Sequence, residues 1–220
     1  MDNSNILSHV DHTLLAPTAT WGEIEKLCAE SIEYKTASVC IPPCYVRRVR
    51  HAYPEITICT TIGFPLGYDV LATKALSTQA AVEDGADEID MVINITDVKN
   101  GDFTTIKTEI QVLKQIVGDK ILKVIIETCY LTEDEKIALC NIVTEAEADY
   151  IKTSTGFGTA GATLEDIKLF KAHIGSEVKM KAAGGIRTRE DMIAFIEAGC
   201  SRLGTSSAVK ILTEGKSEGY

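Results

Sequence analysis

Two lysines near the C-terminal end of the chain occupy positions that packing alone explains poorly. Lys152 lies in DYIKTSTGF and Lys181 in VKMKAAGGI, each on a short apolar run that leads into glycine. An ammonium group inside such a run loses its hydration unless it is paired or neutral. Two of them in successive segments indicate chemistry, because the positive charge of one amine favours the neutral, nucleophilic form of the other. A neutral amine can attack a carbonyl carbon to form a carbinolamine and then an iminium ion.

The alternative for either lysine is an outward side chain that lies along helix surface with its head in water, which is the commoner fate of a strand lysine. Neighbouring parallel strands lie about 4.8 Å apart. If both lysines face inward at similar height, their amines therefore come within mutual reach, and we expect their like charges to oppose each other.

Two acids lie within strand-like segments and need partners. Asp90, in EIDMVIN, can pair with a lysine and relay protons, or form a structural salt bridge with the same lysine, and the two roles are compatible. Asp11, in VDHTLL, has a similar position in the first predicted strand, and structural hydrogen bonding is the expected role of His12 and Thr13 beside it. From the residues alone, Cys40 is expected to pack in the core and Glu127 to form a salt bridge at a strand end.

Two glycine-rich segments near the C-terminus are candidates for phosphate binding. Gly184-Gly185 and the run Gly204-Thr205-Ser206-Ser207 each follow a predicted strand. Backbone N–H groups of such turns, and of a helix that begins there, point at an anion, and serine hydroxyls add donors. The alternative is that the glycines only permit tight turns.

Composition limits the classes of function. With 220 residues, 45% hydrophobic and 25% charged, the chain is long enough for one globular domain with a large core. A net charge of -10 argues against a nucleic-acid surface. No signal-like or membrane-length apolar segment is evident, so we expect no membrane association and a cytoplasmic protein. Seven scattered cysteines indicate reduced thiols, and neither they nor the four histidines have metal-ligand spacing, so no metal is expected.

The elements that must position these residues alternate between strand and helix almost from end to end. We predict strands at about 10–14, 36–41, 57–63, 88–94, 122–128, 149–154, 178–184 and 202–205. Helices are predicted at 21–33, 45–52, 70–84, 103–117, 132–146, 164–173, 189–198 and 207–212. Eight such units favour a compact (β/α)8 barrel of the TIM type, in one domain spanning residues 1–220 with a flexible tail from about 214. The alternative is a doubly wound open sheet, but polar residues at the ends of many strands suit one barrel mouth better.

The motifs VDHTLL, SVCIPP, TTIGFPLG, GADEIDMVIN, KTSTGF, KAAGGIRT and LGTSS, in this order over nearly the whole chain, closely resemble those of the deoxyribose-phosphate aldolase family. The resemblance implies a class I aldolase on a (β/α)8 barrel. Such an enzyme cleaves 2-deoxy-D-ribose 5-phosphate reversibly into D-glyceraldehyde 3-phosphate and acetaldehyde, without metal or cofactor, in deoxyribonucleotide catabolism. It also suggests a homo-oligomer, with a dimer favoured.

The resemblance further implies roles for single residues. Lys152 matches the Schiff-base lysine, Lys181 the lysine that perturbs it, and Asp90 the proton-relay aspartate. Asp11 and Cys40 match further active-site positions. The residues expected to hold the phosphate are Gly156, Gly184, Gly185, Gly204, Ser206 and Ser207.

Three positions need separate comment. The chain has Ala16 where a lysine is expected and Ala208 where glycine is frequent, and neither touches the reacting groups. Some members of the family use a C-terminal tyrosine, so Tyr220 either folds over the mouth as a proton donor or belongs to a disordered tail.

Other functions remain open from the residues alone. A different phosphosugar aldolase or a transaldolase would share the Schiff base but not the two-carbon donor. A non-catalytic phosphosugar-binding barrel would not need an amine that is activated as a nucleophile. An isomerase is disfavoured, because no pair of a glutamate base and a histidine electrophile is evident.

Overall fold

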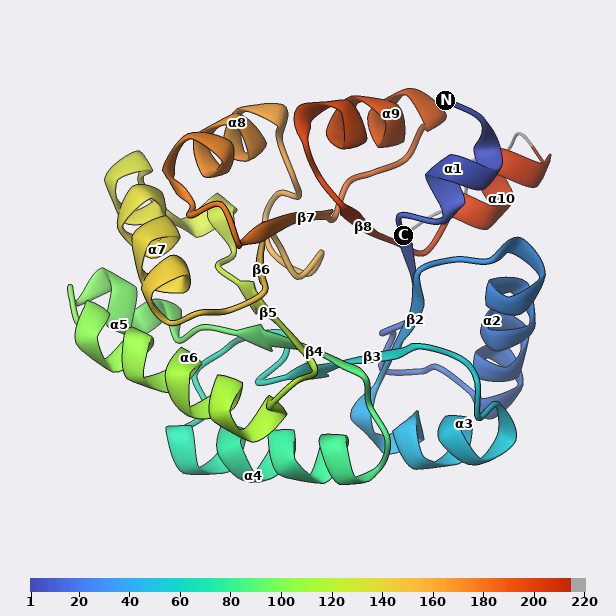
Figure 1. Cartoon of the computed structure of the whole chain (residues 1–220), viewed down its shortest axis with the longest axis horizontal. Coiled ribbons are helices and arrows are strands. Elements are labelled where there is room, and N and C mark those ends of the chain that lie inside the picture. Colours follow the sequence, from blue (N-terminus) through green and yellow to red (C-terminus); the bar gives the residue numbers. More distant parts are fainter. Residues whose placement is uncertain (215–220) are drawn as a thin grey trace.

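The computed structural model describes residues 1–214, and its strands close into a parallel barrel in the order β1 to β8. Figure 1 looks down the barrel, with the helices in a ring outside it. The strands are β1 (Val10–Thr13), β2 (Ser38–Ile41), β3 (Ile58–Ile62), β4 (Glu88–Val92), β5 (Ile121–Ile125), β6 (Tyr150–Lys152), β7 (Lys179–Ala183) and β8 (Arg202–Thr205). The predicted barrel is confirmed, and the open sheet is excluded because β1 pairs with both β2 and β8.

The α-helices alternate with the strands and cover the barrel from outside. They are α1 (Asn3–Leu7), α2 (Trp21–Tyr34), α3 (Val46–Ala52), α4 (Leu71–Glu83), α5 (Ile95–Lys99), α6 (Phe103–Val117), α7 (Glu133–Glu145), α8 (Leu164–His173), α9 (Arg189–Ala198) and α10 (Ala208–Glu214). Two 3-10 turns, η1 (Pro43–Tyr45) and η2 (Thr128–Tyr130), follow β2 and the end of β5. None of the helices in residues 1–214 has the length and apolar character needed to cross a membrane.

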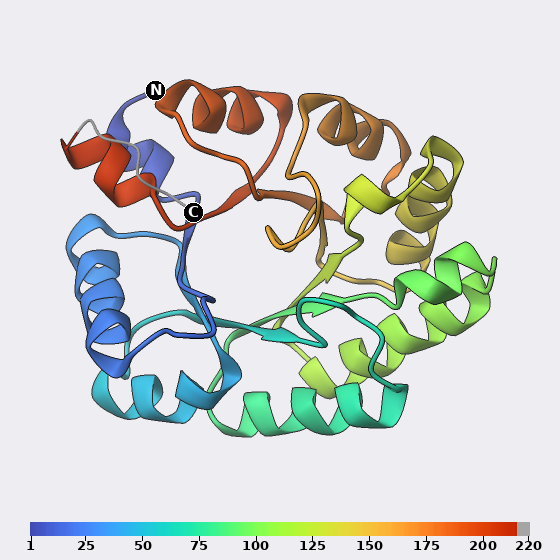
Figure 2. The same ribbon diagram turned by 180° about the vertical axis from the view of Figure 1, so that it is seen from behind.

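Local sequence signals explain several helix starts. Thr20 and Thr132 each accept from the backbone N–H three residues on, while Glu23 and Glu135 bond back to the cap, so α2 and α7 begin with the expected capping boxes. The helices α1 and α5 were not predicted, because five residues are too few to show a helical period. Seen from behind in Figure 2, α1 lies against α10.

Three predicted strands extend two or more residues too far at their C-terminal ends, and the first of them, predicted at 88–94, ends at Val92. The strand predicted at 122–128 ends at Ile125, and that predicted at 149–154 ends at Lys152. Glu127 has a left-handed backbone (φ 53°), which a β ladder does not accommodate. The residues after Lys152 instead form the loop between β6 and α8, which borders the barrel mouth.

An aliphatic core fills the space between barrel and helices. Its buried members include Ile89 and Met91 of β4, Val124 of β5 and Phe170 of α8. The three strand residues among them occupy positions that alternate with the charged ones, because successive side chains of a strand point to opposite faces. The charged positions therefore face the barrel interior.

Candidate active site

Seven charged side chains meet inside the barrel, and we call this set the interior ion cluster. Its members come from six strands and are Asp11 of β1, Glu88 and Asp90 of β4, Lys123 of β5, Lys152 of β6, Lys181 of β7 and Arg202 of β8. Except for Arg202, which is partly buried, every member is at most 3% exposed. Such a cluster is stable only if the charges are paired, since an isolated buried ion is costly.

Asp90 joins the two lysines that the sequence singled out. Lys152 Nζ and Lys181 Nζ both donate to Asp90 Oδ2, at 2.8 and 2.7 Å. The two lysines are Cα partners in the β6–β7 register, which confirms that they face inward at the same height. We expected direct opposition between the two ammonium groups, but the structure places a carboxylate between them.

Asp11 holds Lys181 from the other side. Its Oδ2 lies 2.5 Å from Lys181 Nζ, and its Oδ1 accepts from Ser38 Oγ at 2.9 Å and from Arg202 at 2.6 Å. Asp11 therefore pairs mainly with cations, as Asp90 does. The predicted structural hydrogen bonding of its neighbours is present, since His12 Nε2 lies 2.7 Å from Glu30 Oε2 and the Thr13 hydroxyl donates to the Asp11 carbonyl at 2.7 Å.

Three members of the cluster were missed as site residues by sequence reasoning. Glu88 accepts two hydrogen bonds from Arg202, at 2.7 and 2.8 Å, and lies 2.6 Å from Lys123 Nζ. Lys123 also donates to Asp90 Oδ1 at 2.9 Å. Glu88 lies two residues before Asp90 and therefore on the same face of β4, and Lys123 is the Cα partner of Asp90 on β5. A charge at such a position of an apolar strand is the sequence signal that could have found both.

The carboxylates and their partners shift each other's pKa values. Burial by itself would raise the pKa of Asp90, but the charges of Lys123, Lys152 and Lys181 together lower it well below its ordinary value. Burial likewise opposes ionisation of Asp11, yet Lys181, Lys123 and Arg202 lower its pKa. For Lys181, burial favours the neutral amine, but Asp11 and Asp90 raise its pKa above the ordinary value. Lys181 is therefore held as a cation.

Lys152 is the cation of the cluster with the fewest acidic partners. Its amine meets one carboxylate, Asp90, whereas Lys181 meets two and Lys123 three. With all groups ionised, the four cations face three carboxylates, which leaves one positive charge without its own partner. Lys152 is thus the amine of the cluster with the least compensation from neighbouring carboxylates.

A cavity of about 430 Å³ opens above the cluster at the carboxyl ends of the strands, within the volume range of small-molecule sites. In the part of the chain that the structure describes, Lys152 alone among the cluster members lines it. Asp90, Lys181 and Asp11 are 0% exposed and lie beneath it. A carbonyl compound in the cavity would therefore meet the Lys152 amine and no other amine of the cluster.

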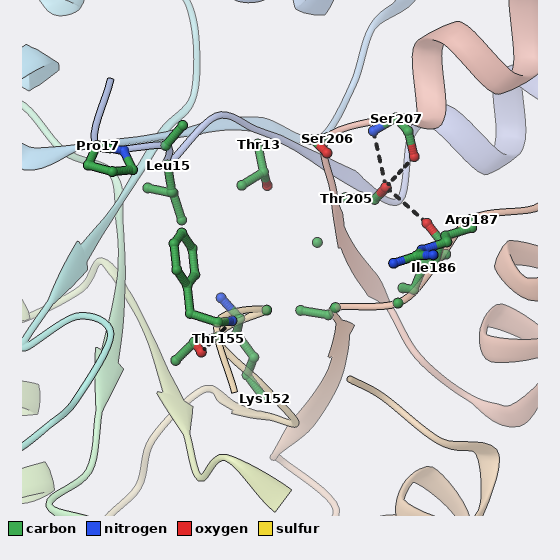
Figure 3. Close-up of a pocket in the computed structure, with 17 residues that line it drawn as sticks. Thr13, Leu15, Pro17, Lys152, Thr155, Ile186, Arg187, Thr205, Ser206 and Ser207 are labelled. Carbon is green, nitrogen blue, oxygen red and sulfur yellow. Dashed lines mark hydrogen bonds between the residues drawn. The ribbon is translucent and has the colours of Figure 1, made fainter. Parts of the chain in front are cut away.

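The predicted phosphate-binding residues line the same cavity: Gly156, Gly184, Gly185, Gly204, Ser206 and Ser207. Figure 3 shows Ser206 and Ser207 across the cavity from Lys152. Gly184 requires a glycine, since its φ is +78° and a Cβ there would lie 3.2 Å from the Cα atoms of Gly156 and Gly161. Arg187, which sequence reasoning did not select, also lines the cavity and brings a positive charge to this side.

Cys40 lies beside the cluster but not on the cavity. It is 1% exposed and is the Cα partner of Cys59 in the β2–β3 register. The neighbouring Cys59 thiol is the main cause that lowers the pKa of Cys40, with a smaller effect from Lys181. Cys59 itself donates to Asp90 Oδ1 at 3.1 Å. Together with Asp90 these thiols come close enough to bind a metal, but the carboxylate is already bonded to lysines.

Glu127 does not form the salt bridge that we expected. Its carboxylate accepts from the backbone N–H of Thr155 at 3.2 Å and also from the Thr155 hydroxyl, which in turn accepts from the Phe157 N–H. Burial raises the pKa of Glu127. The side chain therefore fixes the loop after Lys152 to the end of β5.

The remaining sequence predictions fall at the edge of the site or beyond it. Ala16 lines the cavity, and Ala208 is the buried first residue of α10. Tyr220 and the tail predicted from about 214 lie outside the described residues.

A closed parallel barrel with a lysine at the floor of a cavity and glycine-rich loops at its rim belongs to the class of (β/α)8-barrel enzymes, whose active sites lie at the carboxyl ends of the strands. The chain belongs to the DeoC/LacD family of aldolases, whose family model matches residues 6–209. It is therefore an aldolase, which makes it a lyase.

The relatives agree over the full length of the chain. The deoxyribose-phosphate aldolases of Clostridium botulinum (strain Alaska E43 / Type E3) and Clostridioides difficile (strain 630) are 63% and 57% identical to it. The alignments cover 100% of this chain and 100% of the first relative, and 98% and 99% for the second.

Solved structures agree in fold. The aldolase QR15 superimposes with a TM-score of 0.92 at 37% identity, covering 96% of each chain. The tetrameric deoxyribose phosphate aldolase of Aeropyrum pernix gives a TM-score of 0.88 at 28% identity, covering 97% of this chain and 92% of that one.

Proposed function

We propose that this aldolase cleaves 2-deoxy-D-ribose 5-phosphate reversibly into D-glyceraldehyde 3-phosphate and acetaldehyde, through a Schiff base on Lys152. The names of the relatives support the substrate. The observation that carries the mechanism is that Lys152, alone among the described amines of the cluster, lines the cavity while it is bonded to the buried Asp90. The reaction belongs to deoxyribonucleotide catabolism.

The phosphate of the substrate is held at the glycine-rich side of the cavity. The turn at Gly184 and Gly185 and the segment from Gly204 to Ser207 supply N–H groups and hydroxyls, with Gly156 on the β6 loop. Arg187 adds a positive charge to the same side. The aldehyde carbon C1 of the open-chain sugar then reaches Lys152 on the opposite side.

Carbon–carbon cleavage uses the iminium as an electron sink. Neutral Lys152 adds to C1, and loss of water gives the iminium. Removal of the C3 hydroxyl proton breaks the C2–C3 bond, releases glyceraldehyde 3-phosphate and leaves an enamine on Lys152. Protonation of the enamine at C2 gives the acetaldehyde iminium, and water releases acetaldehyde from the lysine.

Asp90 and Lys181 move the protons for these steps, with water in the cavity as the carrier. Asp90 accepts from both amines, so a proton that Lys152 loses can pass to this carboxylate and its partners. Lys181 remains charged and disfavours protonation of Lys152. Asp11 fixes Lys181, and Cys40 packs beside this pair without reaching the cavity.

Reductive trapping tests the proposal. The protein is treated with acetaldehyde and sodium borohydride, digested and mapped by mass spectrometry. We expect an ethyl group on Lys152, and none there in Lys152→Met. Label on Lys181 instead, or trapping with dihydroxyacetone phosphate but not with acetaldehyde, would reject the mechanism or this substrate class.

We also propose a role for Tyr220 as proton donor to the enamine. Removal of Tyr220 should then slow the exchange of solvent protons into acetaldehyde, and an unchanged exchange rate would reject the role.

We further propose that the protein works in the cytoplasm as a homo-oligomer, with a dimer favoured. All seven cysteines, which lie within residues 1–214, are free thiols, as suits a reducing compartment. A relative from Aeropyrum pernix is tetrameric. Size-exclusion chromatography with multi-angle light scattering would distinguish monomer, dimer and tetramer.

A further inference from the structure

We propose that Glu88 and Arg202 are positioning residues that set, through Asp90 and Asp11, the pH at which Lys152 becomes a nucleophile. The inference rests on the proposed Schiff base at Lys152. Neither residue lines the cavity within the described chain, so neither can touch a substrate there.

Glu88 connects to Lys152 through two hydrogen-bonded partners. Its carboxylate lies 2.6 Å from Lys123, which donates to Asp90 Oδ1 at 2.9 Å, and Asp90 Oδ2 accepts from Lys152 at 2.8 Å. If Glu88 loses its charge, Lys123 depends more on Asp90, and this carboxylate stabilises the Lys152 ammonium less.

Arg202 connects to Lys152 through a second path, which runs through Asp11, Lys181 and Asp90. It donates to Asp11 Oδ1 at 2.6 Å, Asp11 Oδ2 lies 2.5 Å from Lys181, and Lys181 shares Asp90 Oδ2 with Lys152. If Arg202 loses its charge, Asp11 is left with fewer cationic partners, and the whole cluster becomes more negative.

The surrounding groups do not screen these charges as water would. The titratable and charged side chains that face this interior are Asp11, Cys40, Cys59, Glu88, Asp90, Lys123, Tyr150, Lys152, Lys181 and Arg202. Glu127 lies just after β5, and Lys179 lies, like Arg202, over the Tyr150 ring. Most are fully buried, and interactions between buried charges are much less screened than those at the surface.

The sign of each effect follows from the charge balance. Loss of the negative charge at position 88 raises the excess of cations in the cluster, so Lys152 should lose its proton at lower pH. Loss of the positive charge at position 202 removes that excess, so Lys152 should keep its proton to higher pH. A unit charge at roughly 10 Å in a medium of effective dielectric near 20 corresponds to a shift of about one pH unit.

The experiment measures the rate of Lys152 ethylation by acetaldehyde and sodium cyanoborohydride across pH, with peptide mapping to exclude surface lysines. Glu88→Gln should move the acid limb of this profile about one pH unit down, and Arg202→Gln about one unit up. Arg202→Lys, which keeps the charge, should restore the wild-type profile. Glu109→Gln is the matched control, because it breaks the buried Lys74–Glu109 pair outside the barrel and should leave the profile unchanged.

Opposite shifts separate this role from damage to the fold, since damage lowers the rate without moving the limb in two directions. Shifts of the same sign, or no shift in either variant, would overturn the inference while the wild-type adduct still supports the proposed function. No Lys152 adduct in the wild type would overturn the proposed function and this inference with it. If Arg202→Gln does not fold, Lys123→Gln removes a positive charge from the same cluster and should give the same upward shift.

Discussion

Asp90 accepts on one oxygen from both Lys152 and Lys181, so two ammonium groups share a single carboxylate oxygen. The two amines therefore compete for this oxygen as well as repel each other. How strongly Asp90 stabilises one ammonium group depends on the other hydrogen-bond partners of the second. Lys181 has Asp11 as a second partner, while Lys152 has the cavity. The division of roles between two lysines therefore lies in their neighbours and not in their own positions.

Replacement of Lys181 by leucine should lower kcat/KM at neutral pH by about 100-fold or more. Asp90 would then be left with Lys123 and Lys152, and Lys152 would keep its proton. Activity should recover partly at high pH, where Lys152 loses that proton, as a pH series of the retro-aldol rate would show. Lys152→Met provides the comparison, since it should stay inactive at every pH, and a Lys181→Leu profile without alkaline recovery would contradict this explanation.

The sequence was sufficient to select Lys152, Lys181 and Asp90, because charges in apolar strands are conspicuous and the motifs around them are specific. The pairing of Glu88 with Arg202 was not accessible in the same way. The two residues are 114 positions apart and lie on β4 and β8, so their contact depends on how the closed barrel brings opposite strands together. Alternation along one strand gives the face of a residue but not its partner across the interior.

At the scale of elements, two loops form the glycine-rich side of the cavity by direct backbone contact. The Ala162 N–H donates to the carbonyls of both Ala183 and Gly184, at 3.1 Å each. A Cβ on Gly161 would lie 2.3 Å from the Gly184 carbonyl. The loop after β6 and the loop after β7 therefore support each other, and Glu127 anchors the first of them.

Gly161→Ala should raise KM for the phosphorylated sugar about tenfold or more, because the added methyl group pushes Gly184 out of the phosphate site. Trapping of acetaldehyde on Lys152 should change much less, since acetaldehyde carries no phosphate. Steady-state kinetics and the trapping rate measure the two effects separately. Gly22→Ala is a suitable control, as a Cβ there meets nothing within 4 Å. Equal loss in both assays would indicate general damage to the barrel.

Element boundaries followed from sequence where the local signals were complete. The predicted spans for α6, α8, α9 and β8 agree with the structure, and α9 has both a capping box at Thr188 and a left-handed Gly199 at its end. The ends of β5 and β6 were wrong for the opposite reason. The apolar run continues through Ile126, but the backbone at Glu127 turns to meet the Thr155 loop, and that contact is non-local.

At the scale of the molecule, the buried carboxylates connect stability to pH. The cluster's cations lower the pKa values of Asp11 and Asp90 below those of the unfolded chain, which are about 3.9. A carboxylate with a depressed pKa stabilises the fold at pH values above the unfolded pKa, and this contribution is lost as the pH falls toward the folded pKa.

The free energy of unfolding should therefore decrease below about pH 4, by up to about 1.4 kcal/mol per pH unit for each of these two carboxylates. Urea titrations at several pH values measure the slope. Asp11→Asn should be less stable at neutral pH and show a shallower slope in acid, whereas replacement of the exposed Asp69 by asparagine should reproduce the wild-type slope. A slope for Asp11→Asn equal to that of the wild type would contradict the assignment.

The interior ion cluster is also divided by chain order. Its three carboxylates come from β1 and β4, in the first half of the barrel, and its four cations come from β5, β6, β7 and β8, in the second half. Either half alone would have to bury charges of a single sign, which is strongly unfavourable. A duplicated first half or a duplicated second half would therefore be a poor ancestor or design template for this barrel. The interior is electrostatically complete only when the two unlike halves meet, so a charge removed from one half leaves its partners in the other half less compensated.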